Sequence, residues 1–490
     1  MGKVRFLFAA FLFFVATVLQ AQMPAQPVRL ELPLNAAETW VEVIPVPDSS
    51  LLLYHKTSNA WGSKSTFHFT KYDARLEETW AAVADLHADA EFVRHYTEAP
   101  YTYLVFRENI ENDFSFVRLH LKTGDVQLQK YKLSDINAIY EFNVLQGRYF
   151  LIGRNPKNGK PILLFKNPNQ EETKILPSVY GDESTFSDLL TDHANGRVDA
   201  VMSESNGRVS RLQLKSFDAN GNLLRSNFIL PQNEKSLLNA EATPGDSTTQ
   251  LLLGNYGTRD IRYTQGFFTA ATNLTSEVYF YNLLQLKNFF KYLKPRREER
   301  TRKREAARLK AGQEPTNRYR LLLHDLLITP TGYVLAAEVY FPNYSNGNSG
   351  LSRTINYKRE ASIYKRTHAV ALGFDKNGLL LWDNAFPIKN VETTELVHAV
   401  EVGYKPDGKV IIAYPKDKVI HYRIFDQDQY TTEETEVELL PYAKDEKITE
   451  TQESYLVNWY GGNFAAYGFQ RIRTENGPMR SVFYINKLNF

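Results

Sequence analysis

Residues 374–382 carry the sequence FDKNGLLLW, and residues 217–224 carry the related sequence FDANGNLL. In each copy an aromatic residue precedes an aspartate, and an Asn-Gly pair and leucines follow. Asn-Gly is typical of tight turns between antiparallel strands because both residues tolerate a positive φ. The aspartate is expected to close the turn by accepting hydrogen bonds from backbone N–H groups. The pattern therefore predicts a β-hairpin at each place.

Similar turn signals recur along the whole chain. Between them lie apolar or alternating runs of about five to seven residues, a length typical of strands. The clearest expected strands are residues 50–55, 101–107, 114–121, 149–154 and 161–165. An aromatic content of 13% also favours half-buried sheets over helices. We therefore predict an all-β protein built from successive antiparallel hairpins.

The aromatic-Asp-x-Asn-Gly-x-Leu-Leu hairpin, followed by Trp382 in one copy, resembles the outer two strands of a blade in quinoprotein-like and related exported bacterial β-propellers. Residues 217–224 and 374–382 carry this resemblance. It implies a propeller fold. The residues that hold the quinoprotein cofactor have no recognisable counterparts in this sequence, so the resemblance implies no cofactor and no activity.

A radial stack of four-stranded sheets suits many short antiparallel strands, because each sheet then buries both faces and few strand edges stay open. Residues 22–490 are therefore predicted to form one β-propeller. At roughly 50 to 60 residues per blade the length allows seven or eight blades. We predict seven, closed by a strand from each terminus. Two or three separate β-sandwiches are the alternative, although no Pro-rich or Ser-rich linker separates them.

Residues 277–312 interrupt the β pattern and are predicted to form an inserted basic helical hairpin. Apolar residues between 283 and 293 fall at helical spacings, and Pro295 is expected to end the first helix. A second helix is expected over residues 296–310. The segment 287–310 holds eleven Lys or Arg against three Glu, whereas the rest of the chain is mildly acidic.

The basic arm is the sharpest local signal for an interaction. Its candidate binding residues are Arg296, Arg297, Arg300, Arg302, Lys303 and Arg304. They suit an anionic membrane surface, an acidic envelope protein or a polyanionic glycan. Nucleic acid is not expected, because aromatic residues do not interleave with these charges. The alternative is a solvated helix whose glutamates offset the neighbouring positive charges.

Other candidate residues carry weaker signals. Tyr340 and Tyr344 lie in a long polar loop over residues 340–350 and are candidates for stacking on a sugar or a peptide; the alternative is a plain surface loop. Ten histidines are scattered without metal-ligand spacing, so no metal and no cofactor are expected. Asp426 and Asp428 are interpreted as part of an ordinary turn.

One expected blade contains several polar residues that would suit acid–base chemistry. These are His324, Asp325, Glu338 and His368, which would meet near a mouth of the propeller. A lone histidine on a strand is more often simply hydrogen-bonded or solvated, so we assign no catalytic residue. Phosphate-binding glycine loops and a Gly-x-Ser-x-Gly motif are absent from the sequence.

The start of the chain has the form of a secretory signal. Lys3 and Arg5 precede an apolar run over residues 6–19, which predicts a signal peptide over residues 1–21. A retained membrane anchor is the alternative, but the run is shorter than the ~20 residues of a spanning helix. The absence of cysteine excludes disulfides and favours the periplasm or cell surface of a Gram-negative bacterium over an animal extracellular domain.

Three functions remain open at this point. The leading hypothesis is an exported, non-enzymatic binding or scaffold protein of the bacterial envelope. The first alternative is a carbohydrate-active hydrolase or lyase whose carboxylates come from different blades and meet in the central funnel. The second alternative is a peripheral membrane protein docked by the basic arm. Carboxylates gathered in an open funnel would favour the enzyme, whereas a plugged or apolar funnel would favour the binding protein.

Overall fold

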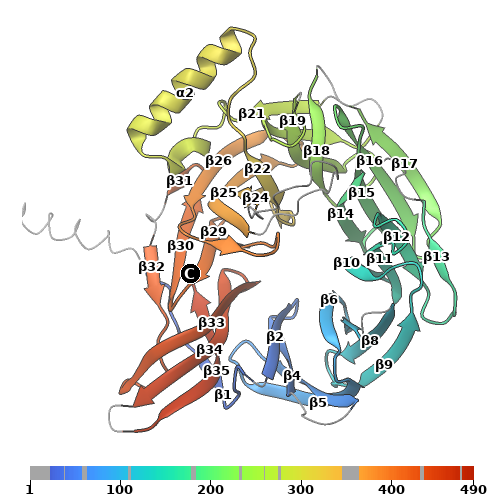
Figure 1. Ribbon diagram of the computed structural model, residues 1–490, viewed down its shortest axis with the longest axis vertical. Coiled ribbons are helices and arrows are strands. Elements are labelled where there is room, and N and C mark those ends of the chain that lie inside the picture. The colour runs from blue at the N-terminus through green and yellow to red at the C-terminus, as the bar shows by residue number, and fades with distance from the viewer. Residues whose placement is uncertain are drawn as a thin grey trace, which may run out of the picture.

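The computed structural model describes residues 23–37, 39–57, 63–108, 112–177, 184–230, 234–258, 260–273, 278–344, 363–430, 435–474 and 477–490. Within these ranges eight antiparallel sheets stand around a central axis like the blades of a propeller (Figure 1). The predicted all-β propeller is confirmed, but the predicted number of seven blades is wrong. The expected signal peptide, residues 1–21, lies outside the described residues.

Blades 1 to 5 each contain four strands that follow one another outward from the channel. Blade 1 is formed by β2 (Thr39–Val46), β3 (Ser50–Thr57), β4 (Lys64–Tyr72) and β5 (Glu78–His87). Blade 2 is formed by β6 (Glu91–Glu98), β7 (Tyr101–Arg107), β8 (Asp113–His120) and β9 (Val126–Lys132). Blade 3 is formed by β10 (Ala138–Leu145), β11 (Arg148–Arg154), β12 (Pro161–Lys166) and β13 (Thr173–Ile175). Blade 4 is formed by β14 (Thr185–Asp192), β15 (Arg197–Ser205), β16 (Ser210–Asp218) and β17 (Leu223–Ile229). Blade 5 is formed by β18 (Ser236–Ala242), β19 (Leu251–Gly257), β20 (Gly266–Ala271) and β21 (Val278–Asn282).

Blades 6 and 7 carry extra short strands. Blade 6 is formed by β22 (Arg320–Leu323), β23 (Leu327–Thr329), β24 (Gly332–Asn343), β25 (Ile363–Asp375), β26 (Leu380–Pro387) and β27 (Glu392–Thr393). Blade 7 is formed by β28 (Glu401–Tyr404), β29 (Val410–Lys416), β30 (Val419–Asp426), β31 (Gln429–Tyr430) and β32 (Thr435–Glu438). All the clearest expected strands are confirmed as β3, β7, β8, β11 and β12.

Blade 8 closes the ring with strands from both ends of the chain. It is formed by β33 (Glu446–Tyr460), β34 (Asn463–Thr474), β35 (Met479–Asn489) and β1 (Arg29–Leu32). β1 pairs antiparallel with β35, with Leu30 opposite Ile485, and so supplies the outermost strand of the blade. The predicted closure by a strand from each terminus is confirmed.

Hydrophobic clusters fill the interfaces between neighbouring blades. On β3, Leu52 and Tyr54 pack in the cluster shared with blade 2, whereas Leu51 and Leu53 pack in the cluster shared with blade 8. Because successive residues of a strand point to opposite faces, a strand buried on both faces is apolar throughout. The continuous run at residues 51–53 is therefore explained by its place in the middle of a blade.

The two repeated hairpins join the third and fourth strands of their blades. The Asp218 carboxylate accepts hydrogen bonds from the backbone N–H groups of Asn220 at 2.8 Å and Asn222 at 2.9 Å. Asp375 closes the equivalent turn in blade 6 in the same way. Gly221 has a φ of +68° and lies so close to blade 3 that an added Cβ would meet a ring carbon of Phe165 on β12 at 2.8 Å. The predicted turn chemistry and its place in the outer hairpin are confirmed.

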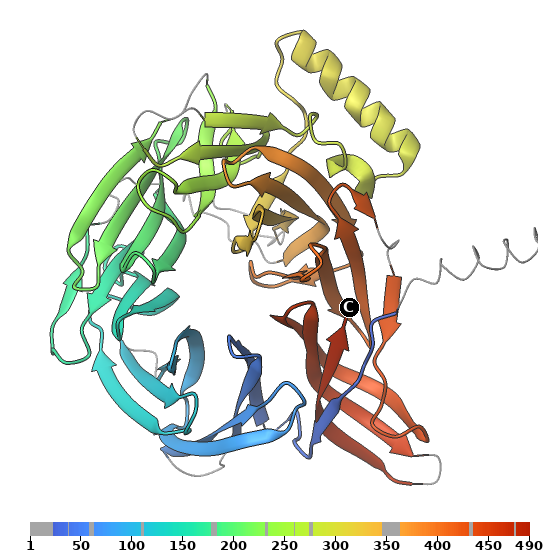
Figure 2. The same cartoon turned by 180° about the vertical axis from the view of Figure 1, so that it is seen from behind.

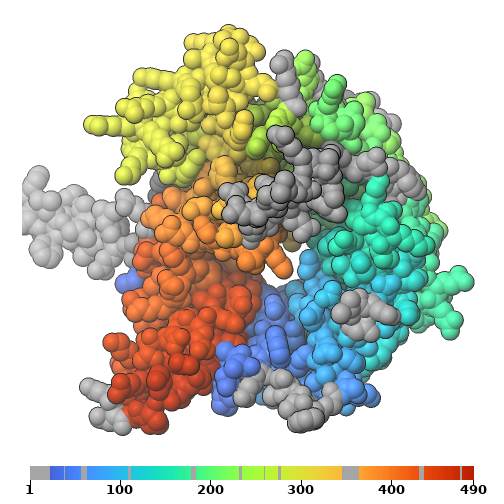
Figure 3. All heavy atoms as spheres, viewed as in Figure 1, coloured from blue at the N-terminus to red at the C-terminus, as the bar shows by residue number. Residues whose placement is uncertain are grey.

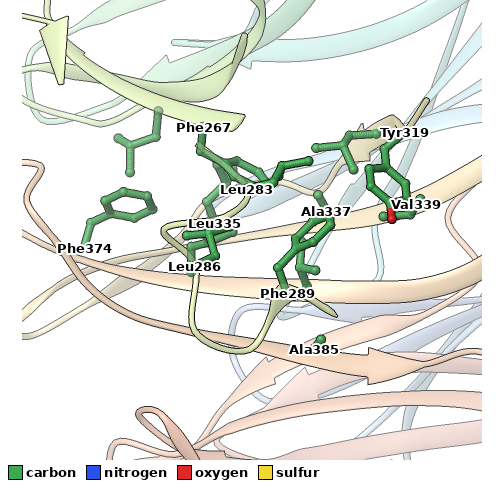
Figure 4. Packing of buried hydrophobic residues seen from close by; sticks show 14 of the residues in the cluster. Phe267, Leu283, Leu286, Phe289, Tyr319, Leu335, Ala337, Val339, Phe374 and Ala385 are labelled. Carbon is green, nitrogen blue, oxygen red and sulfur yellow. The ribbon is translucent and has the colours of Figure 1, made fainter. Parts of the chain in front are cut away.

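The predicted helical hairpin is wrong in its first half. The segment Val278–Asn282 is strand β21, and residues 289–292 form only a short 3-10 turn, η1 (Phe289–Tyr292). The apolar residues at helical spacing instead insert between blades 5 and 6, where Leu286 and Phe289 pack against Leu335 (Figure 4). Their spacing reflects burial of an irregular segment rather than a helix.

The second, basic helix is confirmed as α2 (Pro295–Lys310). Proline at the first helical position suits a helix start, because its missing N–H would have no partner there. Figures 1 and 2 place α2 at the outer rim of the ring, away from the central channel. In the described part of the chain, no helix has both the length and the apolar character needed to cross a membrane.

Arg29 lies on the strand that closes the ring, and its side chain is only 6% exposed. Its guanidinium donates to Glu31 Oε1 at 2.7 Å, Asn486 Oδ1 at 2.8 Å and Gln470 Oε1 at 2.8 Å. It also lies 4.9 Å from the centre of the Tyr484 ring. One side chain thus joins β1 to two strands of blade 8.

We predict that Arg29→Met lowers the free energy of unfolding by about 2–4 kcal/mol, because it leaves buried polar groups without a donor. Urea unfolding followed by tryptophan fluorescence measures this loss. The control is Arg471→Met in the same blade, since Arg471 is 45% exposed and pairs with Glu450 on the surface. We expect the control to cost less than about 1 kcal/mol. Equal losses in the two variants would contradict this role of Arg29.

Candidate functional site

The innermost strands present one side chain at the same point in four consecutive blades. This point lies four residues before the end of the strand and is occupied by Glu42, Arg94, Glu141 and Asp188. In β6, β10 and β14 a β-bulge immediately precedes the residue. Bulges re-aim the side chains next to them and are frequent beside functional sites. The repetition therefore marks a ring of positions around the channel.

Blades 5 to 7 extend this ring with three more carboxyl groups. Glu241 lies on β18, Asp325 lies between β22 and β23, and Glu401 begins β28. We call Glu141, Asp188, Glu241, Asp325 and Glu401 the acidic wall. Figure 3 shows an opening at the centre of the ring, so the innermost strands border a channel rather than a packed core.

Electrostatics shows that the acidic wall faces one common space. The negative charge of Asp325, in blade 6, raises the pKa of Glu141 in blade 3, of Asp188 in blade 4 and of Glu241 in blade 5. It also raises the pKa of Glu401 in blade 7. Carboxyl groups from five blades interact in this way only if they surround the same channel.

Burial is the largest cause of the raised pKa values in the acidic wall. It raises the pKa of Asp188 to about 7 and that of Glu401 to about 7, and it raises the pKa of Glu241 well above its usual range. Glu241 is 7% exposed, whereas Glu141 and Asp325 meet solvent in the channel. Near neutral pH the wall therefore contains both protonated and ionised carboxyl groups.

Hydrogen bonds between blades hold part of the acidic wall in place. Asp188 Oδ2 accepts the N–H of Ala242 in the next blade at 2.8 Å, and Glu401 Oε2 accepts the N–H of Asn458 at 3.0 Å. The side chains of Glu241 and Asp325 have no hydrogen-bond or ion-pair partner among the residues that the structure describes. These two carboxyl groups are therefore available to a ligand.

The structure brings the predicted residues His324 and Glu338 together, but in a structural role. The buried Glu338 carboxylate accepts Nε–H of Arg366 at 2.7 Å and the N–H of Val400 at 3.0 Å, and lies 3.1 Å from Nε2 of His324. Burial alone would raise the pKa of Glu338, but His324 above all, with the Val400 N–H group and the charge of His398, holds it at about 2. Because its oxygens are already occupied, Glu338 joins blade 6 to blade 7 and is not available to a substrate.

His368 does not join this cluster. It is fully buried and stacks on Tyr292 with 3.7 Å between ring centres, beside Phe289. Burial lowers the pKa of His368 to about 3, so the ring is neutral. It anchors the insertion between blades 5 and 6. Asp428 forms an ion pair with Lys287, and Asp426 lies at the turn between β30 and β31, as the interpretation of an ordinary turn requires.

Only half of the predicted basic residues are free of contacts within the protein. Arg302 Nη2 donates to the carbonyl oxygens of residues 286 and 287 at 3.0 and 2.8 Å. Lys303 and Arg304 pair with neighbouring glutamates of α2. Arg296, Arg297 and Arg300 are exposed and have no partner among the described residues. Docking of α2 to an anionic partner or membrane stays a prediction, now carried by these three arginines.

The two predicted tyrosines lie at the end of strand β24 in blade 6: Tyr340 is within the strand and Tyr344 follows it directly. The Tyr340 ring contacts Tyr364, with 5.9 Å between ring centres, and lies 5.7 Å from the Arg366 guanidinium. Tyr344 is 38% exposed and shares a hydrogen bond with Arg320. Residues 345–350 of the predicted loop lie outside the described residues. Ligand stacking on these tyrosines is untested.

The sequence interpretation missed the acidic wall. Its members are single carboxylates about one blade apart in the chain, and no local motif joins them. A usable signal existed only for Glu141 and Asp188, which each lie four residues before the end of an innermost strand and so at a similar distance from the following turn. In the described ranges, no three His, Asp or Glu side chains gather as a metal-binding group.

The fold and the site define the class: an eight-bladed β-propeller with an acid-lined central channel. No protein-family model and no curated protein matches the chain. Among solved structures it is similar to the polysaccharide lyase Uly1, with a TM-score of 0.39 and 10% identity over 81% of this chain and 89% of that chain. It is also similar to a prolyl endopeptidase, with a TM-score of 0.41 and 8% identity over 90% of this chain and 54% of that chain. Likenesses this distant carry no argument about function, and the assignment of the fold rests on the sheets themselves.

We predict that Asp188→Asn stabilises the protein at alkaline pH. The pKa of this carboxyl is raised from 3.8 to about 7, so the folded chain keeps a proton that the unfolded chain releases. The resulting stability is present at low pH and is lost as the pH rises toward 7. Because the side chain meets channel water, we expect a gain of about 1–3 kcal/mol at pH 8 and little change at pH 4.

Urea unfolding at both pH values measures this difference. Asparagine can still accept the N–H of Ala242, so the variant tests the charge rather than the hydrogen bond. Asp445→Asn on an exposed loop is the control and should change the stability little at either pH. A stability difference for Asp188→Asn that does not depend on pH would contradict the raised pKa.

Proposed function

We propose that this protein binds a glycan in its central channel, and that the glycan is neutral or amine-bearing rather than acidic. The observation that carries the proposal is the acidic wall, in which carboxyl groups from five consecutive blades surround one opening. Protonated carboxyl groups donate hydrogen bonds and ionised ones accept them, so the wall suits sugar hydroxyls in both directions. The proposal assigns the binding function expected from the sequence to the central channel.

Exposed aromatic side chains on the innermost strands support the same ligand. Tyr140 on β10 is 42% exposed and Tyr455 on β33 is 49% exposed. Aromatic rings beside a few well-placed polar groups are typical of ligand sites. Their flat faces suit the C–H faces of sugar rings. Tyr140 directly precedes Glu141, so an aromatic face and a carboxyl group lie side by side in the chain.

Charge sets the selectivity that we propose. An acidic channel with low-dielectric walls repels anions more strongly than an open surface does. A polyanionic glycan is therefore disfavoured in the channel, whereas amino groups would be attracted to the ionised carboxyl groups of the wall. Export to the bacterial envelope, where glycans are plentiful, stays a prediction from residues 1–21.

The test is affinity electrophoresis in gels that contain a neutral glycan, chitosan or polygalacturonate. We expect retardation by the neutral glycan or chitosan and none by polygalacturonate. The double variant Glu241→Gln with Asp325→Asn should weaken binding more than tenfold, since it changes the two carboxyl groups that lack protein partners. Glu299→Gln on α2 is the matched control, because it changes an exposed glutamate far from the channel. Retardation by polygalacturonate alone, or an unaffected double variant, would overturn the proposal.

A second candidate function is cleavage of the bound glycan. Asp188 is favoured as a general acid, because its pKa of about 7 keeps a large share of it protonated at neutral pH beside the charge of Asp325. Two carboxyl groups in different protonation states are the arrangement used in glycoside hydrolysis.

New reducing ends released from a retained glycan would measure cleavage. Asp188→Asn should lower the rate at least 100-fold, roughly the share that general acid catalysis supplies, while retardation in the gel is kept. A wild-type protein that is retarded but releases no reducing ends would exclude cleavage and leave binding as the function.

A further inference from the structure

A second cavity lies between blades 1 and 2 and is separate from the acidic wall. It has a volume of about 590 Å³, within the range of small-molecule sites. Its lining includes Trp40, Glu42, Tyr54, Lys56 and Phe92. Burial is the single cause of the raised pKa of Glu42.

At one end of the cavity, the ammonium group of Lys56 already has hydrogen-bond partners within the protein. Lys56 Nζ donates to the carbonyl oxygens of Ala88 at 2.6 Å and Ala90 at 3.3 Å, and it lies 4.9 Å from the centre of the Trp40 ring. The charges of Asp89 and Glu91 also act on this ammonium group. Lys56 therefore already has hydrogen-bond acceptors and opposite charges nearby, so its charge needs no ligand as a partner.

The other end holds a carboxyl group without a partner. The half-buried Glu42 side chain makes no hydrogen bond and no ion pair with any described residue, although most carboxyl groups removed from water are paired. Burial raises the pKa of Glu42 to about 7. Its charge also raises the pKa of Tyr54, which stands opposite Glu42 on β3. An ionised Glu42 thus lacks a positive partner inside the cavity.

Aromatic rings line the same cavity as this carboxyl group. The rings of Tyr54 and Phe92 lie 5.4 Å apart, and those of Tyr54 and Phe67 lie 6.3 Å apart. A cage of aromatic rings with one carboxylate attracts an organic cation through the ring faces and the opposite charge. An anion would be repelled by Glu42, and a neutral apolar ligand would leave it unpaired.

We propose that the cavity between blades 1 and 2 binds a small organic ammonium ion, with Glu42 as its counter-ion and Tyr54 and Phe92 among its aromatic walls. The site does not depend on glycan binding in the channel, because its lining shares no member with the acidic wall. Since the ammonium ion pairs with the ionised carboxylate, binding should release a proton near pH 7 and be tighter at pH 8 than at pH 6.

The test is isothermal titration calorimetry with benzylammonium, benzyl alcohol and benzoate as probes. Benzylammonium should bind at least tenfold more tightly than benzyl alcohol, and benzoate should not bind. Glu42→Gln should weaken benzylammonium binding at least tenfold and remove its pH dependence. Because this variant removes a half-buried carboxyl group without a partner, it should fold at least as stably as the wild type, which thermal unfolding checks.

The matched control is Glu78→Gln, which changes an exposed glutamate on the outer strand of the same blade and should leave binding unchanged. Trp40→Ala, at the Lys56 end of the cavity, should weaken binding less than Glu42→Gln does. Equal binding of benzylammonium and benzyl alcohol, or unchanged binding by Glu42→Gln, would overturn the proposal. Neither result would bear on glycan binding in the channel.

Discussion

The pairing of β1 with β35 is the interaction on which the ring depends. Each sheet has two apolar faces, and a ring buries all of them only if the last blade packs against the first. Trp459 makes that contact: it packs in the cluster shared by blades 8 and 1 and donates its indole N–H to the carbonyl oxygen of Ser50 at 3.0 Å. Without closure, the apolar faces of blades 1 and 8 would meet water, which costs about 25 cal/mol for each Å² exposed.

Closure with eight blades also creates the site. The innermost strands stand around an open channel, so side chains on their inner side meet water instead of a core (Figure 3). Such positions tolerate carboxyl groups that the blade interfaces would exclude. Yet the surrounding sheets keep Asp188, Glu241 and Glu401 partly desolvated, which raises their pKa values. The same geometry therefore supplies water access and groups that titrate near neutral pH.

Much of the fold follows from local patterns in the sequence. Asp218 and Asp375 predicted hairpins, because an aspartate followed by Asn-Gly specifies its turn locally. The run at residues 51–53 predicted a strand, since a blade strand is buried on both faces. The apolar spacing at Leu283, Leu286 and Phe289 led to the wrong prediction of a helix. A segment packed between two blades also places its apolar residues every three or four positions. The blade count failed because the chain length allowed both seven and eight blades, and no local pattern decides between them.

Little of the site follows from local patterns. The acidic wall joins Glu141 to Glu401 across five blades, and only closure of the ring brings such residues together. The predicted contact between His324 and Glu338 was correct, but the sequence did not reveal Arg366 and the Val400 N–H group, which saturate the carboxylate. A pair of residues was thus predictable, whereas its structural role depended on atoms of the next blade.

The most direct measurement is a proton titration of the folded protein between pH 5.5 and 8, compared with the triple variant Asp188→Asn, Glu241→Gln and Glu401→Gln. If the channel holds protonated carboxyl groups at neutral pH, the wild type should release about two more protons than the variant over this range. Identical titration curves would show that these carboxyl groups ionise at ordinary pH, and would contradict the account of the channel.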